Sequence, residues 1–345
     1  MPHPYQSMPP RAFWRSGTRP DDSGLLTGLY QPRFTITPET AIATAGSCFA
    51  QHIGRALRAA DCNLLDIEPP IRRMPAEIAR QFGYEMFSAR YGNIYTPRQL
   101  RELLQDVQNG AVDPGLVWQK DGRFFDALRP GVEPIGLETA DDVLVHRHYH
   151  LERVGQMLRQ ADLFIFTLGL AEAWVDQATG RTLPVCPGVI AGTFDDTQHR
   201  LHCFKHAEVL ADLTAIRDLL HHFQPTMKIL LTLSPVPLTA TARAAHVLTA
   251  TSAAKSTLRA AVDENVQEHA DADYFPAYEI VTSSSCGGPW FGATGRHVRP
   301  EGVEHVMRYF FTAHGLPNLS APQTDADTDE DDLACEDILL QAFAP

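Results

Sequence analysis

Two short apolar runs constrain the fold of this chain more than any other feature of its sequence. They lie at 162–168 (DLFIFTL) and 228–233 (KILLTL) and consist mainly of leucine, isoleucine and phenylalanine. Neither run alternates apolar with polar residues, so each predicts a strand that is buried on both faces. Such strands are typical of parallel sheets covered by helices, and we expect these two to be central.

Helical patterns separate the predicted strands. A run at 40–45 (TAIATA) predicts another strand, which breaks at Gly46 and Ser47. The segment 274–281 (YFPAYEIV) predicts a fourth strand, less regular because Pro276 interrupts it. Apolar residues at helical spacing are Phe49, Ile53, Ala56 and Leu57; Val209, Leu213, Ile216, Leu220 and Phe223; and Val303, Val306, Met307 and Phe310. This alternation predicts a three-layer α/β fold with a mainly parallel sheet.

Changes of composition divide the chain into three parts. Residues 1–30 are rich in Pro, Arg and Gly and are predicted to form an arm, and residues 31–315 to form the α/β domain. Within that domain we interpret 97–147 as an insertion that covers one end of the sheet. Residues 316–345 form an acidic tail, which we expect to be disordered because Pro, Asp and Thr bury little apolar surface.

The net charge argues against some classes of partner. Lys and Arg number 29 and Asp and Glu number 42, which gives a formal charge of −13. Eight acidic residues and no basic residue lie between 325 and 337, so much of the excess is in the tail. An acidic surface is unfavourable for binding nucleic acid or an anionic membrane, and we expect neither.

The sequence also predicts the compartment and the absence of cofactors. No run of about 18 apolar residues occurs that could span a bilayer, and the first residues do not resemble a secretory signal. Six cysteines are scattered without metal-ligand spacing, as in proteins of a reducing compartment, so we expect a cytoplasmic protein. A Gly-rich phosphate loop is absent, and no cofactor is expected. Nothing in the sequence predicts the oligomeric state.

Candidate catalytic residues follow the predicted strands. Ligands of a parallel sheet bind at the carboxyl ends of its strands, and Ser47 lies at that end of the run at 40–45. A serine on a turn between a strand and a helix exposes its hydroxyl for attack near amides that stabilise an oxyanion. Such a serine needs a base, and His297 immediately precedes the last predicted helix. Gly169, Glu172 and Trp174 follow the second strand.

Several separated blocks of the sequence resemble the GSCFA domain family. In order they are GSCFA (46–50), FSARYGNIYTPRQL (87–100), FTLGLAEAW (166–174), CPGV (186–189), YFPAYEIV (274–281) and GVEHVMRYFF (302–311). That family is regarded as a relative of the SGNH/GDSL hydrolases, so the resemblance implies a flavodoxin-like fold and a serine nucleophile. It assigns the nucleophile to Ser47 and the base to His297, five residues before Gly302. The amides of Ser47 and Gly169 are the expected oxyanion donors.

Two positions depart from the SGNH pattern. Thr294 stands where those hydrolases have an Asp three residues before the His, and Ala171 stands where they have an Asn. The loop with Gly92 and Asn93 could supply the missing donor, or it could be a simple turn. His305 is a competing imidazole, although on a helix from about residue 300 it would lie a turn or more away from the site.

Each candidate also has a structural interpretation. Ser47 could cap the following helix through its hydroxyl, and Cys48 could be a core residue or a thiol nucleophile. Glu172 could line the pocket with Trp174 or cap the next helix. Six histidines could suggest a metal site if the first three alternated on a strand, but no metal is expected because carboxylates and cysteines at ligand spacing are lacking. They are His146, His148, His150, His199, His202 and His206.

Three classes of function fit these observations. The first is an SGNH-like serine esterase or O-acyltransferase that acts on acyl esters, acetyl being the commonest, of a carbohydrate or small molecule. The second is a non-catalytic binding module that has kept the pocket. The third is an interaction protein whose acidic tail recruits a basic partner. The sequence favours the first, with Ser47 and His297 as the reacting pair, and does not choose between water and a sugar hydroxyl as acceptor.

Overall fold

The central sheet has four parallel strands in the order β1-β4-β8-β9. The computed structural model describes residues 3–317 and residue 343. The strands are β1 (Ile42–Gly46), β4 (Leu163–Leu168), β8 (Lys228–Leu233) and β9 (Ala272–Phe275). β4 and β8 are central, and all their residues except Lys228 are buried, which confirms the prediction from the two apolar runs.

Helices cover both faces of this sheet. One face packs against α4 (Pro97–Asn109), α5 (Ala140–Gln160), α6 (His206–Phe223) and α7 (Val247–Glu268). The other packs against α2 (Phe49–Ala59), α8 (Ala277–Thr282) and α9 (Pro300–His314). The protein is therefore a three-layer α/β protein of flavodoxin-like type, as predicted.

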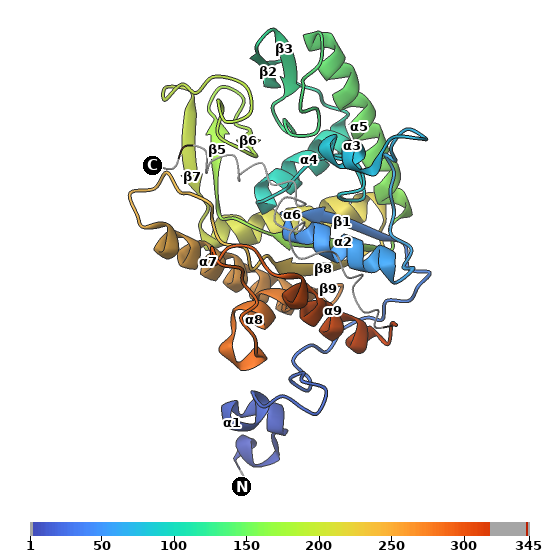
Figure 1. Cartoon of the computed structure of the whole chain (residues 1–345), viewed down its shortest axis with the longest axis vertical. Coiled ribbons are helices and arrows are strands. Elements are labelled where there is room, and N and C mark those ends of the chain that lie inside the picture. The colour runs from blue at the N-terminus through green and yellow to red at the C-terminus, as the bar shows by residue number, and fades with distance from the viewer. Residues whose placement is uncertain (1–2, 318–342, 344–345) are drawn as a thin grey trace.

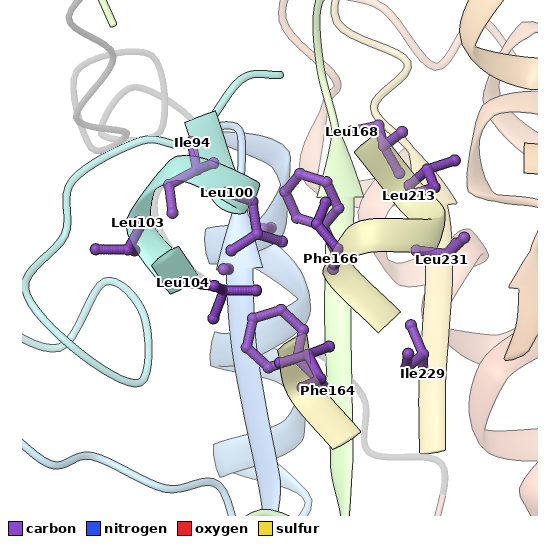
Figure 2. Close-up of a cluster of buried hydrophobic side chains, with 14 of the residues drawn as sticks. Ile94, Leu100, Leu103, Leu104, Phe164, Phe166, Leu168, Leu213, Ile229 and Leu231 are labelled. Atoms are coloured by element: carbon purple, nitrogen blue, oxygen red, sulfur yellow. The ribbon is translucent and has the colours of Figure 1, made fainter. Parts of the chain in front are cut away.

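Alternate residues of β4 pack against the two helical layers. Phe164 and Phe166 point toward Leu100 and Leu104 of α4, beside apolar side chains of β8 and α6 (Figure 2). The intervening residues of β4, Leu163 and Ile165, belong to the cluster with α2 and α9. This is the arrangement expected of a strand that is apolar on both faces.

Smaller elements form a cover above the central sheet (Figure 1). A second sheet, of order β6-β5-β7, is antiparallel, and β2 and β3 form an antiparallel hairpin. These strands are β2 (Val117–Lys120), β3 (Arg123–Asp126), β5 (Glu172–Asp176), β6 (Thr182–Leu183) and β7 (His199–Cys203). The remaining elements are η1 (Pro4–Ser7), η2 (Pro10–Ala12), α1 (Trp14–Gly17), α3 (Ala76–Gln81), η3 (Pro114–Leu116) and η4 (Ser284–Cys286).

Two predicted boundaries differ from the structure. The strand predicted at 274–281 ends at Phe275 as β9, and the rest of it is α8. Pro276 separates the two because it has no N–H for the sheet but suits the start of a helix. The insertion predicted at 97–147 ends inside α5, and its first helix, α4, is part of the layer on the sheet. Within 97–147, only the segment between α4 and α5 covers the sheet without belonging to that layer.

The N-terminal segment is only partly packed against the layers. The first helical turns, including α1, lie apart from the layers, and Trp14 is 80% exposed (Figure 1). Leu25, Leu26 and Tyr30 are buried, and the Leu26 amide donates to the Tyr309 hydroxyl over 2.8 Å. Most of the predicted tail, 318–342 and 344–345, lies outside the described residues. Within the described part of the chain, no helix combines the length and apolarity needed to cross a bilayer.

Candidate active site

Ser47 lies on a tight turn at the carboxyl end of β1. Gly46 has φ 146°, and a Cβ there would lie 2.5 Å from the Thr167 carbonyl oxygen, so this position accepts only glycine. The Ser47 amide donates to the same carbonyl over 3.1 Å. The turn therefore places Ser47 against the end of β4, with only 3% of the residue exposed.

The Ser47 hydroxyl is buried and neither accepts nor donates a hydrogen bond among residues 3–317. The helix α2 begins at Phe49 with Cys48 in the N-cap position, and no side chain caps it. The interpretation of Ser47 as a helix cap is therefore wrong. Cys48 is also buried, in the core cluster below α2 and α9.

Gly169 is in direct contact with Ser47. A Cβ at residue 169 would lie 2.9 Å from the Ser47 Cβ, so a larger residue would collide with the serine. The amides of Gly169 and Leu170 both donate to the Tyr95 carbonyl over 2.9 Å. The predicted oxyanion donors, the amides of Ser47 and Gly169, thus already donate to backbone carbonyls in this conformation.

The structure brings the Gly92–Asn93 loop to the same turn. Gly92 has φ 68°, and the Ile94 amide donates to the Gly46 carbonyl over 2.8 Å. Asn93 is 2% exposed, and its Oδ1 accepts from Gln51 Nε2, one helical turn after Ser47. The loop predicted to compensate for the missing Asn is therefore adjacent to the candidate nucleophile.

Glu172 is the first residue of β5 and lies three residues after Gly169. The alternative in which Glu172 caps a helix is wrong, because the segment is a strand. Its Oε1 accepts from the Thr241 hydroxyl over 2.7 Å, whereas Oε2 makes no hydrogen bond in the described part of the chain and lies 3.9 Å from Arg243. Burial raises the pKa of this carboxyl. Trp174, further along β5, instead contacts Phe194 and the small cover cluster.

Lys255 of α7 was not among the residues predicted from the sequence. It is 2% exposed, and its Nζ donates to the Gly169 carbonyl oxygen over 2.8 Å. A sequence clue exists: Lys255 lies among the buried small and apolar residues Ala250, Ala254 and Leu258, where a solvated lysine would not be expected.

The two candidate bases occupy different environments. His297 is partly buried in the loop before α9, and its carbonyl accepts from the Gly292 amide over 2.9 Å. Its ring makes no hydrogen bond to the Ser47 hydroxyl, which lacks any partner among the described residues. His305 is buried within α9 and stacks on Trp290 with ring centroids 4.6 Å apart. Burial lowers the pKa of His305.

The histidines that suggested a metal site are dispersed. His146, His148 and His150 lie on helix α5 instead of a strand, so they do not share one face. His150 is fully buried and its Nδ1 lies 2.7 Å from Glu68 Oε2. In the described ranges, 3–317 and 343, no group of three or more potential metal ligands occurs.

Further buried hydroxyls lie near the carboxyl ends of the strands. Thr167 of β4 and Thr232 of β8 are register partners, and Gly46 pairs with Thr167 in the same row. Both threonine hydroxyls lack hydrogen-bond partners in the part of the chain described. The end of the sheet next to Ser47 is therefore lined with polar atoms that the fold itself does not use.

These features define a class: a three-layer α/β protein with a serine on the glycine-dependent turn after its first strand. The chain matches the GSCFA family over residues 41–310 and belongs to that family. No curated protein matches it.

Proposed function

We propose that this protein is a serine-dependent esterase or O-acyltransferase, related in mechanism to the SGNH hydrolases. One observation carries the proposal: the Ser47 hydroxyl lies at the carboxyl end of β1, buried and without a described hydrogen-bond partner, on a turn that requires Gly46. A buried hydroxyl without a partner destabilises the fold, so a functional reason for it is expected.

The proposed reaction has two steps. Ser47 Oγ bonds to the ester carbonyl carbon, its proton passes to His297, and the carbonyl electron pair moves to the oxygen. The oxyanion then reforms the carbonyl, the ester C–O bond breaks, and the leaving alkoxide takes the proton from His297. Water or a sugar hydroxyl then attacks the acyl carbon of the acyl-enzyme while its proton passes to His297. The bond from that carbon to Ser47 Oγ breaks, and Ser47 regains the proton from His297. The His297 ring must approach Ser47 for this reaction, because no hydrogen bond joins them in this conformation.

The oxyanion donor in this proposal is the side-chain amide of Asn93. Its loop adjoins Gly46 and Gln51 by hydrogen bonds, which keeps it next to the reacting serine. The substrate is an acyl ester, probed as acetyl, of a carbohydrate or small molecule. A cytoplasmic location is also part of the proposal, supported by five unpaired cysteines in the described residues.

A second function, ligand binding without catalysis, is favoured by a different observation. The Ser47 hydroxyl has no imidazole partner among residues 3–317, and the amides of Ser47 and Gly169 are already engaged. A site that has lost its base and its oxyanion donors would look like this.

The test is the activity of the full chain on p-nitrophenyl acetate and its labelling by a fluorophosphonate probe. Ser47→Ala should lower the hydrolysis rate about 10³-fold or more and abolish labelling. Its melting temperature should equal or exceed that of wild type, because the variant loses a buried hydroxyl without a partner. Ser234→Ala is the matched control, because Ser234 is a buried serine after β8 whose hydroxyl accepts from the Val236 amide. Equal activity of Ser47→Ala and wild type would contradict catalysis by Ser47.

The same assay identifies the base. A general base works only in its unprotonated form, so the wild-type rate should fall as acid protonates the base. His297→Ala should remove most of the rate and this pH dependence, whereas His305→Ala should leave both within a few-fold. The reverse pattern would assign the base to His305.

A further inference from the structure

Lys255 is a buried lysine whose position calls for an explanation. Lysine is almost never fully buried without a partner, because taking an ammonium group out of water is unfavourable. Here the residue is 2% exposed, and its Nζ donates to a neutral group, the Gly169 carbonyl oxygen, over 2.8 Å.

Gly169 connects Lys255 to Ser47. The glycine carbonyl accepts from Lys255, and a Cβ on the same residue would lie 2.9 Å from the Ser47 Cβ. Standard bond lengths therefore limit the distance from Lys255 Nζ to Ser47 Cβ to about 10 Å. Lys255 of α7 and Ser47 of the turn between β1 and α2 thus both contact Gly169.

We infer that Lys255 is a positioning residue for the Ser47 reaction: its ammonium group fixes the Gly169 carbonyl and keeps a positive charge beside the reacting serine. This inference rests on the proposed function. When Ser47 attacks an ester, negative charge develops on the former carbonyl oxygen. A unit charge about 10 Å away stabilises such an oxyanion by a factor of about 15 at an effective dielectric constant of about 20.

The test measures the rate of fluorophosphonate labelling at Ser47, in which the Oγ–P bond forms, fluoride leaves and the serine proton passes to a base. Lys255→Met and Lys255→Gln should each lower this rate tenfold or more, because both remove the charge. Lys255→Arg should keep it within about threefold, because it retains a cation that can donate to the Gly169 carbonyl. Lys228→Met, at the exposed amino end of β8, is the control and should label at the wild-type rate.

The Arg variant separates charge from packing. A lysine that only fills space in α7 would be replaced better by Met than by the larger Arg, so Met should then react as fast as Arg or faster. That result, or near-wild-type labelling of both Met and Gln variants, overturns the inference. Lys255→Gln, which keeps a donor for the Gly169 carbonyl, replaces Lys255→Met if the latter fails to fold. If wild-type protein is not labelled at Ser47, the proposed function fails together with this inference. If wild type is labelled and Lys255→Met and Lys255→Gln are labelled at the same rate, the inference alone fails.

Discussion

Buried polar groups are paired in one region of the molecule and lack hydrogen-bond partners in another. Between α4, α5 and the turn after β5, buried carboxylates meet cations. Asp106 accepts from Arg147 and, through both its oxygens, from Arg181, at 2.6–2.9 Å. At the carboxyl end of the central sheet, by contrast, Ser47 Oγ and Glu172 Oε2 have no hydrogen-bond partner in the described part of the chain.

The contrast separates buried polar residues that stabilise the fold from those that do not. The ion pairs of Asp106 join α4, α5 and the residue before β6, so they attach the cover to the helical layer. The Ser47 hydroxyl makes no hydrogen bond in the described part of the chain and carries a desolvation penalty. A group of that kind is where function is expected, because native structures leave few buried polar atoms unsatisfied.

Asp106→Ala should have the largest effect of the substitutions that test this contrast. It leaves the guanidinium groups of Arg147 and Arg181 without their main partner, and breaking a buried pair costs about 3–5 kcal/mol. Urea unfolding should report this loss in the free energy of unfolding. Asp218→Ala, which removes a 68% exposed partner of Arg217, should change it by about 1 kcal/mol or less. Equal effects of the two variants would refute the idea that the cover depends on buried ion pairs.

His150, buried in α5, predicts part of the pH dependence of stability. Burial lowers its pKa to about 4, below the ordinary 6.5, and its ring contacts Glu68. Since the folded protein resists protonation at this site, the contribution of His150 is complete above about pH 6.5 and is lost as the pH falls toward 4. The difference amounts to about 3 kcal/mol. His150→Gln should remove this part of the pH dependence of unfolding, whereas His148→Gln, exposed on the same helix, should not.

Glu172→Gln should have the smallest effect and the opposite pH dependence. Burial raises the pKa of Glu172, so its contribution to stability is present at low pH and is lost as the pH rises through the folded-state pKa. Glutamine keeps the acceptor for Thr241 and removes the desolvated charge. At pH 7 we expect the variant to be as stable as wild type or more stable, within about 1 kcal/mol, by thermal unfolding. A clear destabilisation at pH 7 would group Glu172 with Asp106, as a carboxylate that stabilises the fold through an ion pair.

The central sheet could be predicted from the sequence because its determinants are local. Strands that are buried on both faces must be mainly apolar, as the runs at 162–168 and 228–233 are. The helix α5 was missed because Arg147 and His150 occupy buried positions where a periodic pattern needs apolar residues. The strand β7 (HRLHC) was missed because pairing with β5, not its own composition, makes it a strand.

The candidate site was predictable only in part. Ser47 could be found because Gly46 and the following helical pattern mark a sharp turn in a few consecutive residues. The carbonyls that engage the amides of Ser47 and Gly169 could not be found, because they come from β4 and from Tyr95. Lys255 lies 86 residues from its partner Gly169, and no local pattern encodes such a contact.

The Tyr95 carbonyl also determines how the site can open. It accepts from the amides of Gly169 and Leu170, while the neighbouring Ile94 amide donates to Gly46. Residues 94 and 95 therefore link the end of β1 to the end of β4 through three hydrogen bonds. Any displacement of this segment breaks bonds at both strand ends, so the two turns form one cooperative unit of local unfolding. The amides of Gly169 and Leu170 are released for a ligand together or not at all.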